Sequence, residues 1–561
     1  MTKATAVMLV AGRQKDVADG HEMFLAAQRL APDLPYPYFA HASYLIDRDI
    51  GGFARWVSAG LKGYRVAWQW PDTRFPWSLK LLVFGLLALL AASFAFIVAQ
   101  TVRQFGIVAY DLARVLPKGF SSNQTVVLLL GIIIVPGVVL KSPLLALLTL
   151  GALLSVSMRW NERFVAALVF ALLASMPWVD RTADNLASYS ASPAQALFTA
   201  QYVACDAACI EDLSARRQAS PDDAYVLFTE LLALYRTGDK SAMKRIVEEV
   251  PSTSWPAAVA PYAYNLAGVA ELALGNADPA LDWFQKASSG MNGQAAPAFN
   301  AMRAHQMKDD LDAASRSLAE ATARNIEQVS VYLTYDRRDV NSFMMAPGLP
   351  LGVFWDYHLV TPREARSVIT PYWQAIAGKQ FELGMSQWVG VAGLLWVLLW
   401  GLLRLRARMS TPCPKCGLAR DPRDDKTTGA HHLCLPCYRT FVTGAGLDYR
   451  ARVYNEKVLG GRSRLQSGLR RVGSVIAPGA GHHLAGRSIT GFSMGTSAVL
   501  GLLLAVFPLG IVRPAQELGS NNWGGGVTVG WLLVSIVLLI ALNAALRDIE
   551  PVSVGQTRRP K

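Results

Sequence analysis

Long apolar runs separated by polar segments dominate the pattern of this 561-residue chain. A run of about 20 apolar residues is long enough to cross the hydrocarbon core of a bilayer as a helix. We predict such helices at 78–100, 386–403, 489–512 and 527–546, and shorter membrane segments at 124–140, 142–158 and 164–178. Residues 101–120 mix basic and apolar side chains, which predicts either a helix on the bilayer surface or a continuation of the first span.

The polar segments between the spans also have helical patterns, so the predicted fold class is an all-α membrane protein. Its outline is a polytopic helical bundle with smaller domains outside the membrane. The predicted parts are an N-terminal helical segment at 1–78, a membrane region at 79–178, an extramembrane domain at 180–384, a transmembrane helix at 386–403, a cysteine-rich segment at 410–442, a basic amphipathic segment at 448–472 and a C-terminal transmembrane hairpin at 488–546.

The predicted domain at 180–384 contains an internal repeat. Ala267, Ala280, Phe284 and Ala287 recur 34 residues later as Ala301, Ala314, Leu318 and Ala321. Thirty-four residues is the period of tetratricopeptide repeats, in which two helices form each unit. Gly268 and Tyr264 stand where that repeat has a small and an aromatic residue, so the domain resembles this family. Residues 1–78 resemble it more faintly, through Phe24 and Ala27. The resemblance implies an α-solenoid that binds proteins or peptides.

Two Cys-x-x-Cys pairs, Cys413 with Cys416 and Cys434 with Cys437, are separated by seventeen residues. This spacing is typical of a zinc ribbon, in which four thiolates hold one zinc ion. A pair of redox motifs is the alternative. The neighbouring histidines at 431 and 432 could replace a ligand, bond to the thiolates or lie in solvent. Four protein ligands leave no open position for a substrate, so the sequence predicts a structural zinc site.

The formal net charge of +13 is distributed unevenly along the chain. Residues 404–471 contain fifteen Lys and Arg against five Asp and Glu, whereas 180–382 contain seventeen against twenty-four. Basic residues beside spans are typical of the cytosolic side, and thiolate ligands need a reducing compartment. We therefore expect the cysteine-rich segment in the cytosol and the repeat domain outside it, in the inner membrane of a bacterium.

The N-terminal side is harder to assign. No cleavable signal peptide is evident, because the apolar stretch at 6–11 is short and runs into charged residues. We therefore expect a cytosolic N-terminus, which requires an odd number of crossings before residue 180. One of the two short segments at 124–158 would then not cross. The alternative is that residues 1–78 are translocated.

Cys205 and Cys209 are four residues apart in the predicted external domain. At that spacing on a helix their Cα atoms would lie about 6 Å apart, within disulfide range although strained. We expect a structural disulfide there, since oxidation is the default outside the cytosol. Free buried thiols are the alternative.

The stretch 477–487, Ala-Pro-Gly-Ala-Gly-His-His-Leu-Ala-Gly-Arg, leads into the penultimate span. It resembles the entry to small two-span bacterial membrane proteins of the TM2-like kind. The resemblance implies a tight turn and close helix approach at the glycines, with Arg487 at the inner interface. His482 and His483 could be ligands or acid–base groups, but no carboxylate or cysteine is close in sequence, which favours a structural role.

The sequence shows no catalytic constellation, so we expect a protein that is not an enzyme. The expected function is that of a membrane-anchored scaffold or assembly factor for an envelope machine such as a pilus, motility or secretion apparatus. Its partners would be the bilayer and proteins or peptides held by the repeats. One alternative is a transporter or lipid-handling enzyme, which the scarcity of ionisable residues in the spans disfavours. The other is a membrane-tethered nucleic-acid binder, which the juxtamembrane placement of the basic residues disfavours.

Overall fold

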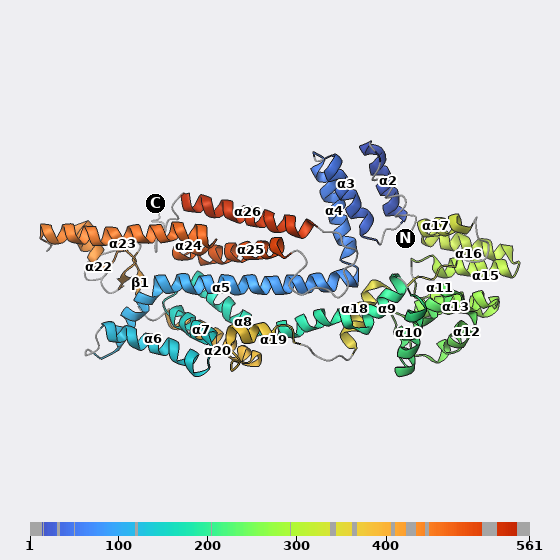
Figure 1. Ribbon diagram of the computed structural model, residues 1–561, viewed down its shortest axis with the longest axis horizontal. Coiled ribbons are helices and arrows are strands. Elements are labelled where there is room, and N and C mark those ends of the chain that lie inside the picture. The colour runs from blue at the N-terminus through green and yellow to red at the C-terminus, as the bar shows by residue number, and fades with distance from the viewer. Residues whose placement is uncertain are drawn as a thin grey trace, which may run out of the picture. The chain divides into compact units, whose positions relative to one another are not determined.

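The computed structural model confirms an all-α membrane protein (Figure 1). It describes residues 14, 16–30, 34–49, 51–117, 122–203, 205–291, 293–336, 344–361, 367–404, 410–413, 415–421, 433–443, 448–507 and 524–546. Among these residues, four helices are long and apolar enough to cross a membrane: Pro71–Val115, Trp160–Ala191, Leu383–Leu403 and Ser488–Val506. Contacts divide the chain into two compact units, Met1–Pro76 with Ser188–Glu364, and Trp77–Ala187 with Ala365–Lys561.

The first unit is built from short helices. Its elements are α2 (Val17–Leu30), α3 (Tyr36–Arg48), α4 (Phe53–Ala67), η1 (Ser188–Ala191), α9 (Pro193–Tyr202), α10 (Ala207–Ala219), α11 (Ala224–Thr237), α12 (Lys240–Val247), η2 (Val250–Ser252), α13 (Ala260–Leu274), α14 (Ala277–Ser288), α15 (Ala296–Met307), α16 (Leu311–Arg324), α17 (Ile326–Asp336) and α18 (Leu351–Val360). Helices α11 to α16 form three successive antiparallel pairs, and Gly238 and Gly275 end the first helix of two pairs with positive φ angles.

Close packing inside the α13–α14 pair depends on one glycine. A Cβ atom at Gly268 would lie 2.5 Å from the ring of Phe284 and 3.0 Å from the backbone oxygen of Ala280. Both Ala280 and Phe284 are fully buried. The next pair, α15–α16, is joined to this one by a hydrophobic cluster that contains Ala304. Small residues therefore stand where α13 and α14 approach most closely.

Replacing Ala280 by tryptophan should open this helix pair. Over-packing of a well-filled core costs about 1–3 kcal/mol, and in a helical array it also weakens the neighbouring interface. We expect Ala280→Trp to increase protease cleavage between residues 224 and 324 while the metal content of the chain stays unchanged. The matched control is Asp282→Asn on the same helix, where the side chain is exposed. Equal protease resistance of Ala280→Trp and the parent would contradict this packing.

The beginning of α5 (Pro71–Val115) belongs to the core of the first unit. Phe75 stacks on Tyr189 with ring centroids 4.0 Å apart and on Trp355 at 4.3 Å. The Tyr189 hydroxyl donates a hydrogen bond to the Asp72 carboxylate at 3.0 Å. Segments in contact cannot lie on opposite sides of a bilayer, so the start of α5 shares a side with η1 and α18. This packing favours the alternative in which residues 1–78 lie on the same side as the repeat domain, and the side of the N-terminus stays a prediction.

The second unit contains the spans and the cysteine-rich segment. Besides the rest of α5, its elements are α6 (Ser122–Val139), α7 (Pro143–Ser155), α8 (Trp160–Ala187), α19 (Thr370–Ala377), α20 (Leu383–Arg404), β1 (Thr411–Pro412), β2 (Ala419–Arg420), α22 (Leu435–Tyr438), η3 (Arg439–Thr443), α23 (Tyr449–Ile476), α24 (Ala480–Leu484), α25 (Ser488–Val506) and α26 (Gly524–Leu546). Figure 1 shows α25 beside α26, and Met494, Val537 and Ala541 form the cluster between them.

Glycines let α20 pack closely on α8. A Cβ atom at Gly390 would lie 2.4 Å from the backbone nitrogen of Ala174, and one at Gly393 would lie 2.1 Å from the Phe170 ring. Small residues are common where membrane helices meet, because they allow the backbones to approach. The two helices therefore form one tightly packed pair.

Residues 101–115 continue the first span as part of the 45-residue helix α5, which was one of the two predicted outcomes. The apolar side chains of this extension, including Phe105 and Leu112, pack with Leu129 and Ile133 of α6. The extension therefore forms a helical platform beyond the apolar part of α5.

Candidate metal centre

The cysteine-rich segment brings its two Cys-x-x-Cys pairs together on short elements. Cys413 follows β1, and Cys416 lies in the turn before β2, whose register with β1 pairs Thr411 with Arg420. Gly417 closes the turn with a φ of 73°, and its backbone N–H donates to the Cys413 carbonyl at 2.9 Å. Cys434 is the N-cap residue of α22, and Cys437 lies one turn later in that helix. The predicted clustering of four cysteines is confirmed.

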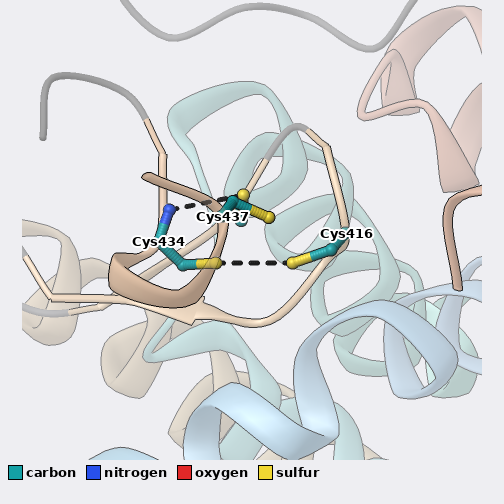
Figure 2. Close-up of side chains that lie close together, drawn as sticks. Cys416, Cys434 and Cys437 are labelled. Carbon is teal, nitrogen blue, oxygen red and sulfur yellow. Dashed lines mark hydrogen bonds between the residues drawn. The ribbon is translucent and has the colours of Figure 1, made fainter. Parts of the chain in front are cut away.

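The four sulfur atoms have the spacing of a tetrahedral metal site. All four Sγ atoms lie within 4.8 Å of one another, and those of Cys416 and Cys434 are 3.4 Å apart (Figure 2). A tetrahedron with zinc–sulfur bonds of about 2.3 Å has sulfur–sulfur edges of about 3.8 Å, which falls within this range. Each cysteine is at least 97% buried. The cluster can therefore hold one metal ion away from solvent.

The thiols of the cluster influence one another's protonation. Hydrogen bonds with Cys416, Cys434 and Cys437 hold the pKa of the Cys413 thiol below its usual range. Hydrogen bonds with Cys413, Cys416 and Cys434 raise the pKa of Cys437 above its usual range. A bound divalent cation would supply the charge that allows all four sulfurs to lose their protons.

Apolar and basic residues cover the cluster. Leu459 of α23 is 5% exposed and packs directly against the four cysteines, with Leu418, Leu433 and Phe441 around it. The Lys415 ammonium lies 3.3 Å from the centroid of the Phe441 ring. The backbone N–H of Cys434 donates to the Cys413 sulfur at 3.4 Å. This shell resembles a small core that needs the metal, since so few residues cannot bury enough apolar surface alone.

The cysteine-rich segment is fixed to the platform at the end of α5. The backbone N–H of Ser410 donates to the Asp111 carboxylate at 3.2 Å, and Arg114 forms an ion pair with Asp421. On the other side, the Gln466 amide of α23 donates to the Cys416 carbonyl at 3.3 Å. These anchors are not evident from the sequence, in which Asp111 and Arg114 are only charges that interrupt an apolar pattern.

The histidines near the predicted site do not join the cysteines. His431 and His432 lie outside the described residues. His482 and His483 are buried in α24, 8% and 1% exposed, and the described metal-ligand cluster contains the four cysteines only. His483 packs against Phe96 with ring centroids 5.3 Å apart. The structural role expected of the two histidines at the entry to α25 stays a prediction.

Cys205 and Cys209 are joined by a disulfide with a Cα–Cα distance of 5.1 Å. The expected regular-helix geometry is wrong, because α10 begins at Ala207 and Cys205 precedes it. Asp206 caps this helix, and its side chain accepts a hydrogen bond from the Cys209 backbone at 3.0 Å. Because the helix begins only after this cap, Cys205 is free of helical geometry.

A buried polar network joins α5, α8 and α25, and sequence analysis missed it. Glu162 is fully buried, forms an ion pair with Arg103 and accepts a hydrogen bond from the Gln104 amide at 3.0 Å. The Gln100 amide donates to the Ser488 hydroxyl at 3.1 Å. The spans are thus less poor in buried ionisable residues than expected. The paired glutamines at i and i+4 inside an apolar run were the available signal.

The chain has been compared with family models, curated proteins and solved structures, and none of them matches it. The arrangement of the cysteines supports structural metal binding, with four protein ligands and no open coordination position.

Proposed function

We propose that this chain is a membrane-anchored scaffold that holds extended peptide segments with its helical repeats and carries a structural zinc ribbon on the cytosolic side. The bilayer anchor is the group of long apolar helices. The metal would be zinc, because four buried thiolates at tetrahedral spacing match its preferences. The repeats would belong to the tetratricopeptide type, and the membrane would be the bacterial inner membrane.

One observation carries the peptide-binding part of this proposal. Asn265 of α13 and Asn300 of α15, both fully buried, each donate a side-chain hydrogen bond to the Met345 carbonyl at 2.9 Å. The Asn300 side-chain oxygen accepts the Met345 backbone N–H at 2.7 Å. The two asparagines also bond to each other at 3.0 Å. The first helices of two successive pairs, α13 and α15, therefore bind both main-chain polar groups of one extended residue.

The same extended segment is held again further along. The backbone N–H of Leu349 donates to the Gln201 side chain at 2.9 Å, and the Tyr202 hydroxyl donates to the Leu349 carbonyl. Met345 and Leu349 are fully buried. Main-chain hydrogen bonds combined with pockets for alternate side chains are the usual means of binding an extended peptide. Helices α9, α13 and α15 thus already hold residues 344–349 of the same chain in this manner, which supports a partner of the same kind.

The experiment should separate the helical scaffold from the asparagine pair. Asn300→Leu leaves the Met345 N–H without its partner, which costs about 1–3 kcal/mol for a buried group. We expect faster hydrogen exchange at 344–349 and a changed set of proteins co-purifying with the full chain in mild detergent. The matched control is Lys308→Leu at the end of the same helix, where the side chain is exposed.

Two results would argue against the proposal. One is an unchanged exchange rate at 344–349 in Asn300→Leu, which would mean that the asparagine does not hold the segment. The other is recovery of the same partners after deletion of residues 190–340, which would place the recruiting surface elsewhere.

A further inference from the structure

A pocket of about 90 Å³ lies within the second unit, next to the cysteine cluster. Four parts of this unit line it: the end of the apolar stretch of α5, the turn before α8, the cysteine-rich segment, and α23 with α24. Three arginines, Arg103, Arg159 and Arg470, are among the lining residues, together with Gln466. Among the residues that the structure describes, the lining contains no Asp or Glu. The wall of the pocket is therefore strongly basic.

The carboxylate of Glu162 fixes the position of Arg103 in this wall. Glu162 pairs with the Arg103 guanidinium and also accepts the Arg159 backbone N–H at 2.8 Å. One carboxylate thus holds two of the basic residues in place while neutralising a single charge. The three arginines and Glu162 together therefore carry a net positive charge. Preorganised guanidinium groups favour phosphate and carboxylate anions, which accept two parallel hydrogen bonds.

The pocket also has apolar lining residues, and two of them, which we call its rim, are exposed. Val102 of α5 and Leu469 of α23 line the pocket and are 62% and 42% exposed. Val102 lies where the apolar stretch of α5 gives way to its charged extension. A ligand with an anionic group for the arginines and hydrocarbon for the rim would match both surfaces. Basic pockets between membrane helices on the cytosolic side bind anionic headgroups for the same reason.

We infer that this pocket binds a phosphate group, and that the group is carried by an anionic phospholipid of the surrounding bilayer. The arginines would hold the phosphate, and Val102 and Leu469 would contact the adjoining hydrocarbon. A soluble phosphate ester would use the same arginines without the rim. The binding of lipid would join α5, α23 and the cysteine-rich segment through one headgroup, independently of any peptide held by the repeats.

A different role for the arginines must be distinguished from this one. A zinc ion with four thiolates carries about two negative charges, and Cys413 also lines the pocket. The arginines could then serve only to balance the metal centre. In that case their replacement would lower metal content, whereas lipid binding requires a loss of lipid at unchanged metal content.

The test uses the full purified chain in detergent with added phosphatidylglycerol or phosphatidylcholine, and native mass spectrometry counts the bound lipids. We expect preferential retention of phosphatidylglycerol. Arg470→Gln and Arg159→Gln should each weaken it about tenfold, the effect of losing one charge-assisted hydrogen bond. Arg470→Lys should restore part of the binding, because it keeps the charge. Arg462→Gln is the matched control, since Arg462 is an exposed arginine of the same helix.

Four other results would contradict the binding of an anionic phospholipid in this pocket. Competition by glycerol phosphate would identify a soluble phosphate ester as the ligand, and the lipid assignment would be wrong. An equal loss in Arg462→Gln would show diffuse surface charge instead of a pocket. Loss of metal in both Arg470→Gln and Arg159→Gln would assign the arginines to the metal centre. Equal retention of the two lipids would overturn the inference.

Discussion

Purified chains with Cys413→Ser or Cys434→Ser should contain no bound zinc, whereas the parent should contain about one ion per chain. A hydroxyl is a poor zinc ligand, and three remaining thiolates leave the tetrahedral site open. Structural zinc supplies roughly 10–16 kcal/mol of apparent binding free energy in small zinc-binding peptides. We therefore expect the segment around 410–443 to unfold as well, which limited proteolysis would detect. Elemental analysis of the purified chain measures the metal directly.

The double variant Cys205→Ser/Cys209→Ser is the control for loss of cysteines. These residues form a separate disulfide in the first unit, so the metal content should not change. Full zinc occupancy in both single variants of the cluster would rule out the four-thiolate site. A different metal at full occupancy would keep the site but correct its assignment to zinc.

Single cysteines introduced at Ser43 and Asp310 should react with an impermeant maleimide in intact spheroplasts, whereas one at Lys457 should not. All three positions are exposed. Ser43 precedes the helix whose beginning packs against Tyr189 and Trp355, so it should share a side with Asp310. Lys457 lies in α23 beside the cysteine cluster, which should face the cytosol.

The effect should be all or none, because a bilayer blocks the reagent completely. Permeabilised cells provide the control, since all three positions should then react. Labelling at Asp310 without labelling at Ser43 would restore the cytosolic N-terminus that the sequence favoured. Labelling at Lys457 alone would mean that the whole chain is inverted.

The parts of this fold that were predictable from sequence are those encoded by neighbouring residues. Each Cys-x-x-Cys pair is local, and its spacing alone constrains the turn and the α22 N-terminus that present the thiolates. The close approach of the helices at Gly268 follows from a repeat of small residues, which is also evident from the sequence alone. Hydropathy located three of the four long spans, because helix length and bilayer thickness are directly comparable. The fourth, Trp160–Ala191, was predicted only as the shorter segment 164–178.

The parts that were not predictable depend on contacts between distant residues. Phe75 read as one apolar residue near a span, yet its partners are Tyr189 and Trp355. Glu162 read as a charge between two membrane segments, yet it is fully buried against Arg103. The sequence around Phe75 or Glu162 does not indicate which residue is its partner, since any apolar ring could pack on Phe75 and any arginine could pair with Glu162. Only the folded chain selects one.

The anchoring of the cysteine-rich segment on α5 has a consequence for the order of synthesis. The contact between Asp111 and Ser410 joins residues 299 positions apart. A ribosome adding roughly 5–20 residues per second needs about 15–60 s to cover that distance. The end of α5 is therefore made well before the segment that binds to it. During this interval Asp111 and Arg114, three residues apart on one helix face, can pair with each other, and α6 already covers the apolar side of the platform. The charged and apolar groups of the platform thus have partners before the cysteine-rich segment has been synthesised.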